Sequence, residues 1–351
     1  MKTLSLIFFT LFLASMQAQA GCLDLPRLTG VNVAGAESNS GVLPGEFGKN
    51  YIYPTTAELN FLASQNVTVI RLPIRWERVQ TALNGPLNPL EIRRLQETIH
   101  TANNLGMCVM IDIHNYAKYF GVALNGNAAL QNGFVDVWLK LAAEFSNADT
   151  TILDLMNEPN YIPLAEWGPL AKRTVSELRK AKAKNIIVVS GGKWSGIHDW
   201  FSLSGEVSNA TAFADLRDPL NRTIIQVHQY VDEYYSGTTT LCKSPDKFDA
   251  MFSKITQWAK DNQQQLFLGE FGMPATTECL ATLEKMLSLM GDPVWRGFTY
   301  WAVGRWWNNY PFALNLTSTA PVAPQWAILK KYFQKPLVRK SAPKPPVVDP
   351  I

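Results

Sequence analysis

Two short stretches of the chain each place a glutamate at the end of an apolar run. Residues 152–156 form a largely apolar run that leads through Asn157 to Glu158, and residues 266–269 lead in the same way to Glu270. A lone Asn-Glu-Pro is equally consistent with a salt-bridged glutamate at a strand end, because an isolated buried carboxylate is costly. Two glutamates that each follow an apolar run of strand length favour a carboxylate pair. Such a pair beside a glycosidic bond hydrolyses it, one residue as proton donor and the other as nucleophile or base.

Eight apolar runs of strand length recur along the chain at intervals of about 30 to 45 residues. They are residues 28–33, 67–72, 107–113, 152–156, 186–189, 224–227, 266–269 and 297–301. Most of the gaps hold a segment with helical periodicity. These segments are 56–63, 89–104, 134–145, 165–181, 248–262 and 279–289. Strand and helix alternating eight times predict an α/β protein with a single (β/α)8 (TIM) barrel domain, and continuous apolar strands fit a parallel sheet covered by helices.

Active sites in this architecture lie at the carboxyl ends of the strands, so the residues that follow each run are the candidates for the site. In strand order they are Asn32, Arg71, His114, Asn157 with Glu158, Trp194 with His198, His228 with Tyr230, Glu270 and Trp301. The barrel therefore predicts that polar and aromatic side chains converge on one rim.

The two ends of the chain lie outside this pattern. Residues 1–20 combine a lysine, a short apolar run and an Ala-x-Ala sequence, which predicts a signal peptide and an exported protein. Residues 335–351 are rich in proline and lack periodicity, which is typical of a tail or linker. The catalytic domain is therefore expected to span residues 21–334.

Composition excludes some classes of function. The chain has 32 basic and 29 acidic residues, so no strong basic field favours nucleic acid as a partner. No run after the signal peptide is long and apolar enough to span a membrane. The 11 tryptophans are more informative, because sugar rings stack on flat aromatic faces.

Four cysteines in an exported chain favour two disulfides, and sequence alone leaves three pairings open. We favour Cys22 with Cys108 and Cys242 with Cys279. The last two cysteines lie in loop-like surroundings, each just after a predicted strand end.

The residues at the predicted rim resemble glycoside hydrolase family 5. Eight positions in order match the active-site set of that family: Arg71, His114, Asn157, Glu158, His228, Tyr230, Glu270 and Trp301. The loops that open at Gly30 and Val227 are similar to those of secreted endo-β-1,4-glucanases of bacteria and filamentous fungi. Mannanases and β-1,3-glucanases share the same eight residues, so mannan, xyloglucan and β-1,3-glucan remain alternative substrates.

The resemblance assigns a role to each member of the set. Glu158 is expected to be the acid/base with a raised pKa, and Glu270 the ionised nucleophile, about 5 to 5.5 Å apart in a retaining double displacement. Arg71 and Tyr230 are expected to keep Glu270 ionised.

The remaining members are expected to bind the sugar. Asn157 is expected to bind a 2-hydroxyl. His114 and His228 are expected to bind hydroxyls or to adjust the pKa of Glu158. Trp301 is expected to form the floor of the subsite that holds the cleaved sugar.

Further residues near strand ends are candidates for binding the rest of the substrate. They are Asn32, Tyr116, Trp194, Trp306 and Trp307. An aromatic residue in a barrel loop is at least as often a packing residue, and that alternative stays open for each of them.

Two rival functions fit the sequence less well. A metal site built from Asp112, His114, His228 and Glu270 is disfavoured, because a guanidinium beside a metal is unfavourable and few donors face one another. A catalytically silent carbohydrate-binding barrel would tolerate loss of a glutamate, and both glutamates are present. The sequence therefore predicts a secreted, monomeric β-glucan hydrolase that needs neither metal nor cofactor.

Overall fold

The computed structural model describes residues 21–307, 309–317 and 322–334. The predicted signal peptide and the proline-rich tail lie outside the described residues. None of the described helices is long and apolar enough to cross a membrane.

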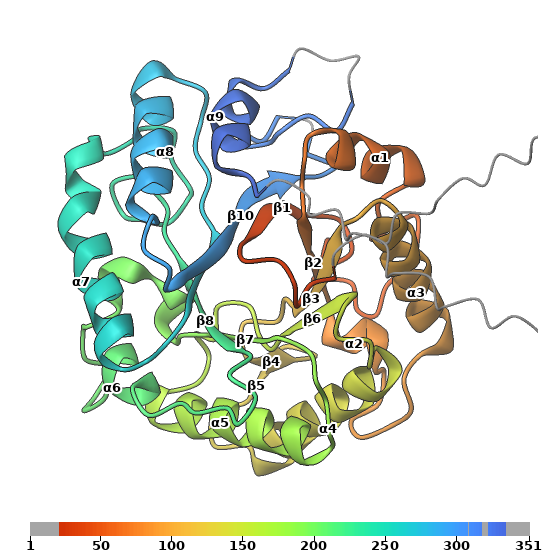
Figure 1. Ribbon diagram of the computed structural model, residues 1–351. Helices are drawn as coiled ribbons and strands as arrows, with labels where there is room; N and C mark the ends of the chain where they lie inside the picture. Colours follow the sequence, from red (N-terminus) through yellow and green to blue (C-terminus); the bar gives the residue numbers. More distant parts are fainter. Residues whose placement is uncertain (1–20, 308, 318–321, 335–351) are drawn as a thin grey trace, which may run out of the picture.

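Eight parallel strands close into a barrel (Figure 1). Around the barrel they are β1 (Leu28–Val33), β2 (Val69–Ile74), β3 (Cys108–Ile113), β6 (Thr151–Asp154), β7 (Ile187–Ser190), β8 (Thr223–His228), β9 (Leu266–Glu270) and β10 (Trp295–Val303). Helices ring the outside of the barrel. They are α1 (Thr56–Ser64), α3 (Pro89–Asn104), α4 (Ala128–Glu144), α5 (Leu164–Lys180), α6 (Asn209–Phe213), α7 (Asp249–Asp261), α8 (Thr277–Leu289) and α9 (Pro324–Tyr332). The predicted (β/α)8 barrel is confirmed.

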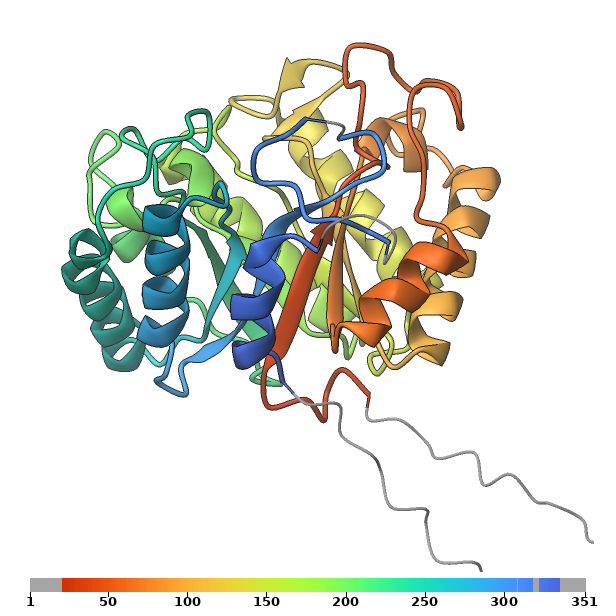
Figure 2. The ribbon, with the colours of Figure 1, turned by 90° about the horizontal axis from the view of Figure 1, so that it is seen from above.

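Shorter elements decorate the rim at the carboxyl ends of the strands. They are the helix α2 (Trp76–Val79), the hairpin of β4 (Lys118–Tyr119) and β5 (Val122–Ala123), and the 3-10 turns η1 (Lys193–Ser195), η2 (Ile197–Asp199) and η3 (Pro245–Phe248). Figure 2 shows the hairpin and the loop after β10 at the same end of the barrel.

Local sequence explains where the outer helices begin. Thr55 and Glu58 form a capping box at the start of α1, in which each side chain accepts a hydrogen bond from the other's backbone N–H. Asn88 caps α3 through the Leu90 N–H, and Pro89 occupies the first turn, where no intrahelical N–H is needed.

The inside of the barrel changes from apolar to polar along its axis. At the amino ends of the strands an apolar cluster fills the barrel, and it includes Leu28, Met110, Ile152 and Phe267. Near the carboxyl ends the fully buried side chains of Arg71 and other polar residues replace it. The apolar floor therefore supports a buried polar layer directly beneath the rim.

Both favoured disulfides are formed, with Cα atoms 5.6 Å apart for Cys22 and Cys108 and 5.4 Å apart for Cys242 and Cys279. The first ties the start of the described chain to β3 at the floor of the barrel. The second ties the loop after β8 to the first turn of α8.

Some element boundaries differ from those predicted. The strand predicted at 152–156 ends at Asp154, so Glu158 lies in the loop beyond β6, whereas Glu270 is the last residue of β9. The sequence analysis also missed α6 and α9, which are short and carry only one or two turns of apolar periodicity.

Candidate active site

A cleft of about 870 Å³ opens at the carboxyl ends of the strands. Loops after most of the strands contribute to its walls. The residues that line it include Arg75, His114, Tyr116, Lys118, Glu158, Tyr161, Trp194, His198, His228, Tyr230, Tyr234, Tyr235, Glu270, Trp301 and Tyr310.

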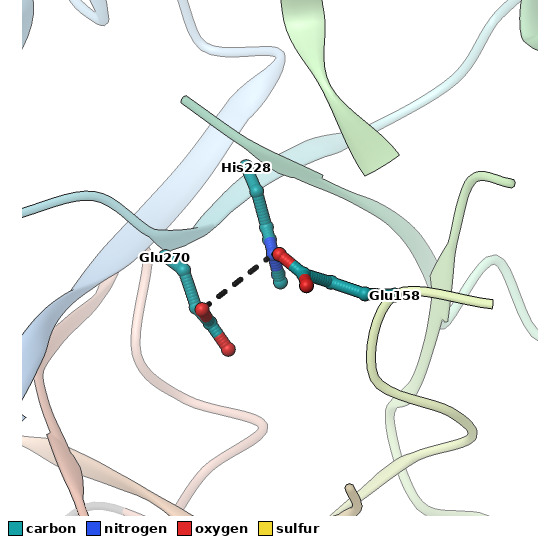
Figure 3. A group of neighbouring side chains, drawn as sticks. All are labelled: Glu158, His228 and Glu270. Carbon is teal, nitrogen blue, oxygen red and sulfur yellow. Dashed lines mark hydrogen bonds and ion pairs between the residues drawn. The ribbon is translucent and has the colours of Figure 1, made fainter. Parts of the chain in front are cut away.

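Glu158 and Glu270 approach one another across the floor of this cleft (Figure 3). Three atoms lie within 4.8 Å of one another: one carboxylate oxygen from each glutamate and a ring nitrogen of His228. Glu158 has a φ of 43°, in the left-handed region that a non-glycine residue rarely adopts. The chain therefore brings the two glutamates together from separate elements, one from a strand end and one from a constrained loop.

Each oxygen of the Glu270 carboxylate has its own partner. Arg71 Nη1 donates to Oε1 at 2.7 Å, and the Tyr230 hydroxyl donates to Oε2 at 3.0 Å. Glu270 is only 3% exposed, and charge-assisted hydrogen bonds of this kind stabilise a buried carboxylate in its ionised form. The arrangement fixes the orientation of the Glu270 carboxylate beside a permanent positive charge.

Arg71 is the centre of a buried network beneath the cleft. Its guanidinium pairs with Glu270, with Asp154 Oδ2 at 2.6 Å and with Asp112 Oδ2 at 3.0 Å. Burial lowers the pKa of Arg71, but attraction to the three carboxylates outweighs burial and raises its pKa above the ordinary value. The guanidinium is therefore a fixed positive charge.

The two aspartates of this network are themselves perturbed by burial. Burial raises the pKa of Asp112 to about 7 and that of Asp154 to about 6, and in both cases Arg71 opposes the rise. The network thus contains carboxylates whose ionised state depends on the arginine.

Glu158 lies in a different environment. Burial raises the pKa of its carboxyl to about 8, and the positive charge of Arg71 opposes this rise. Its Oε1 lies 2.7 Å from Nδ1 of His228, whose pKa burial lowers to about 4. At neutral pH the structure therefore favours a protonated Glu158 beside a neutral imidazole, which is the state a proton donor requires.

His114 links the buried network to the cleft wall. Nδ1 lies 2.7 Å from Asp112 Oδ2, and Nε2 lies 3.2 Å from both the Tyr116 hydroxyl and Asn157 Nδ2. The imidazole stacks on Trp301 with ring centroids 5.4 Å apart, and burial lowers its pKa well below the usual value. A neutral His114 is thus fixed in orientation by its carboxylate partner.

Aromatic side chains form the wall of the cleft beyond the glutamates. Trp194 is 45% exposed and meets Tyr116 edge-on at 5.8 Å and Tyr161 at 6.5 Å. The three residues of η1 all have a positive φ, which turns this segment sharply at the rim. Trp194 therefore presents an indole to the cleft from a tightly constrained turn.

Several residues expected to contact substrate lie elsewhere. Asn32 and Asn157 are fully buried, and their side-chain oxygens each accept a hydrogen bond from Arg71 at 2.9 Å. Trp307 packs against Trp301 with ring centroids 5.4 Å apart, and Trp306 lines a neighbouring pocket. The structure places these four outside the lining of the cleft, whereas Tyr116 and Trp194 line it.

The sequence analysis did not assign Asp154 and Tyr310 to the site. The signal for Asp154 was present, because a carboxylate inside an otherwise apolar strand requires a buried partner, and that partner is Arg71. Tyr310 lies nine residues beyond Trp301 in an irregular loop, where no periodicity could indicate its position.

The donor set at the glutamates fits a metal ion poorly. Glu158, His228 and Glu270 lie close enough to share an ion. However, both oxygens of Glu270 are already hydrogen-bonded, and the Arg71 guanidinium lies 2.7 Å from one of them, where it would repel a cation.

Comparison with known proteins agrees with this geometry. Residues 27–309 match the family model described as cellulase (glycosyl hydrolase family 5). An endo-β-1,4-glucanase from Xanthomonas axonopodis pv. citri is 37% identical, with a TM-score of 0.84 over 87% of this chain and 98% of that one. XacCel5A, solved in complex with cellopentaose, is 39% identical, with the same TM-score over 87% of this chain and 99% of that one.

A fungal relative gives the same result. Endoglucanase gh5-1 from Neurospora crassa is 30% identical over 307 residues, which are 86% of this chain and 76% of that enzyme. The match of the family model over most of the chain, with relatives of this kind, shows that the chain belongs to glycoside hydrolase family 5 and that the protein is a glycoside hydrolase.

Proposed function

We propose that the protein is a secreted, retaining endo-β-1,4-glucanase that cleaves internal links of cellulose or a related β-glucan. The observation that carries the proposal is the pair of glutamates with opposite electrostatic surroundings at the floor of an open, aromatic-lined cleft. The relatives named as endoglucanases, and the one solved with cellopentaose, support the choice of substrate.

The separation of the two carboxylates supports a retaining mechanism. Inverting glycosidases need room for a water molecule and hold their carboxyl groups about 6.5 to 9.5 Å apart, whereas retaining enzymes hold them about 5 to 5.5 Å apart. Oxygens of Glu158 and Glu270 lie within 4.8 Å of each other, which is nearer to the shorter of these separations and supports direct attack by one glutamate.

In the first step, the ionised Glu270 attacks the anomeric carbon while Glu158 transfers its proton to the departing glycosidic oxygen. A covalent glycosyl ester forms on Glu270, and the leaving chain departs as an alcohol. In the second step, Glu158, now a carboxylate, removes a proton from water. The water oxygen bonds to the anomeric carbon as this proton passes to Glu158, the ester bond to Glu270 breaks so that Glu270 departs as a carboxylate, and the product leaves with its original configuration.

The protein is proposed to act outside the cell as a monomer. The sequence of residues 1–20 and the two disulfides support export, because disulfides persist in oxidising compartments.

Product analysis on a substrate panel tests this proposal. Carboxymethylcellulose, barley β-glucan, xyloglucan, glucomannan and laminarin are incubated with the enzyme, with and without EDTA, and the products are separated by chromatography. We expect short β-1,4-linked gluco-oligosaccharides from the first two substrates, at a rate that EDTA does not change. Products from mannan or laminarin alone would contradict the substrate, and no product from any polysaccharide would favour a silent binding barrel.

The raised pKa of Glu158 predicts the alkaline limit of activity. The proton donor works only while protonated, so kcat/KM on a soluble β-glucan should fall as pH rises through about 8, by about tenfold per pH unit beyond it. Initial rates between pH 5 and pH 10 measure this limb, with a melting curve at each pH to exclude unfolding. A limb near the ordinary pKa of a glutamate would contradict the assignment of Glu158 as the acid.

A further inference from the structure

A second pocket of about 640 Å³ lies on the outer flank of the barrel, beside the catalytic cleft. Its walls come from the loop before α1, the first turns of α1, one face of α3 and the loop after β10. Figures 1 and 2 both show α1 and α3 side by side on this flank. The pocket is lined by Phe47, Gly48, Ile52, Tyr53, Pro54, Thr55, Thr56, Leu59, Arg94, Glu97, Thr98, Thr101, Arg305 and Trp306.

Trp306 is the main aromatic surface of this pocket. Its side chain is 39% exposed and has no ring contact or hydrogen bond with any other residue in the described parts of the chain. The preceding Arg305 anchors the loop, because its guanidinium pairs with both carboxylate oxygens of Glu58 and donates to the Tyr53 carbonyl. A partly exposed indole is thus carried on an anchored loop at the wall of this pocket.

A second exposed ring lines the same pocket. Phe47 is 44% exposed, its edge meets Tyr51 at 5.8 Å, and the Arg94 guanidinium lies 4.2 Å from the ring centroid. Such a cation–π contact fixes the orientation of an exposed ring. Phe47 and Trp306 line one pocket, and exposed apolar surface gathered in a groove is typical of a ligand-binding site.

The charges of the pocket disfavour an anionic ligand. Arg94 pairs with Glu91, and Arg305 pairs with Glu58, so both guanidinium charges are balanced. Glu97 is exposed, and its carboxylate has no partner among the described residues. The unbalanced charge of the pocket is therefore negative, which excludes phosphate or an acidic peptide as a fitting ligand.

The remaining polar groups suit a neutral polyhydroxyl ligand. Thr101, one turn beyond Glu97 on α3, donates its hydroxyl hydrogen to a backbone carbonyl within the helix and keeps oxygen lone pairs free to accept. A pyranose ring offers hydroxyl donors at its edge and C–H groups on its face, which match these acceptors and the flat rings.

The pocket adjoins the cleft through two neighbouring tryptophans. Trp307, the residue after Trp306, packs on Trp301 in the cleft with ring centroids 5.4 Å apart. We propose that this flank pocket is a second glucan-binding site, an inference that rests on the proposed activity on β-glucan. Trp306 is its stacking platform, and Glu97 accepts hydrogen bonds from sugar hydroxyls. It holds a stretch of polysaccharide outside the cleft and so raises the local concentration of substrate at the glutamates.

Stoichiometry with a defined oligosaccharide tests the proposal. Full-length Glu158→Gln enzyme, which retains the cleft but does not turn over, is titrated with cellopentaose by calorimetry. We expect two sites of different affinity. Trp306→Ala and, separately, Glu97→Ala should weaken one of them at least about tenfold, a loss of the size expected for a stacking or hydrogen-bond partner.

Trp194→Ala is the matched control, because it removes an indole of similar exposure from the cleft. It should weaken the other site and leave the Trp306-dependent one unchanged. Melting curves establish that each variant is folded. Two sites that persist in both flank variants, or a single site in the Glu158→Gln enzyme, would overturn the second site. No binding of cellopentaose at all would instead overturn the proposed substrate.

Binding to insoluble glucan gives an independent readout. The affinity of the Glu158→Gln enzyme for amorphous cellulose is measured by its depletion from solution. Adding Trp306→Ala should lower this affinity about tenfold, because one of two attachment points is lost. Unchanged depletion would overturn the role of the pocket in holding the polysaccharide.

Discussion

Alanine at Glu158 and alanine at Glu270 are expected to stop hydrolysis of β-glucan, each by at least about four orders of magnitude in kcat, but to fail at different steps. The difference arises from their surroundings. Glu270 is hydrogen-bonded by Arg71 and Tyr230, whereas Glu158 lies beside His228 with a pKa of about 8. An activated substrate, 2,4-dinitrophenyl β-cellobioside, separates the two roles because its leaving group needs no proton.

With this substrate, Glu158→Ala should still form the glycosyl ester on Glu270 and then stall, since no base activates water. Azide needs no base and fits the space left by the side chain, so it should restore turnover and yield the β-cellobiosyl azide with net retention. Glu270→Ala lacks the nucleophile, and azide can attack only from the face that Glu270 vacates. That variant should yield the α-cellobiosyl azide, with inversion.

The configuration of the azide product, read by proton NMR, decides the assignment. The opposite pairing of anomers would reverse the two roles, and a near-normal rate in either variant without azide would remove that residue from the mechanism. Glu177→Ala is a suitable control, because that glutamate lies on the outer surface of α5 and pairs with Lys180. It should leave the rate unchanged.

The fold could be predicted from sequence because each barrel strand is buried on both faces and therefore reads as a continuous apolar run. The rim followed from the same pattern, since parallel strands end together. Glu270 illustrates this directly, because it is the last residue of β9. Glu158 was harder to place, because β6 ends at Asp154 and the backbone then turns through residues whose conformation no periodicity encodes.

The buried layer beneath the rim could not be read from the chain in the same way. Asn32 and Asn157 follow strand ends, as substrate-binding residues do, yet both side chains point to Arg71. Which side of the rim a residue faces depends on the stagger of neighbouring strands. Likewise, the destination of Trp306 depends on the path of the loop after β10, which places it on the outer flank instead of in the cleft.

The second large effect is expected at Arg71, through both stability and catalysis. Arg71→Met keeps the volume of the side chain but leaves Asp112, Asp154 and Glu270 without their shared positive partner. Removing one member of a buried charge network costs about 3 to 5 kcal/mol of unfolding free energy. The kcat/KM should also fall by about two to three orders of magnitude or more, because the nucleophile loses the group that orients it and stabilises its charge.

The loss of stability should depend on pH in a defined direction. Burial raises the folded-state pKa of Asp112 to about 7 and of Asp154 to about 6, above the value of about 4 expected in the unfolded chain. Their ionisation therefore costs stability as pH rises, and Arg71 reduces that cost only where they are ionised. Arg71→Met should thus be destabilised more at pH 8 than at pH 5, as measured by urea unfolding, and an equal loss at both values would contradict the role of the ion pairs.

A double variant separates the structural contribution of Arg71 from its catalytic one. Asp154 makes the shortest contact with the guanidinium, and Arg71→Met/Asp154→Asn makes this partner neutral as well. Part of the lost unfolding free energy should return, because one fewer buried carboxylate is left uncompensated. The rate should not return, since Glu270 and Asn157 still lack the donor that positions them. If stability and rate recovered together, Arg71 would act only by holding the barrel together. Recovery of stability alone would identify the guanidinium as the group that keeps the nucleophile charged and aimed at the sugar.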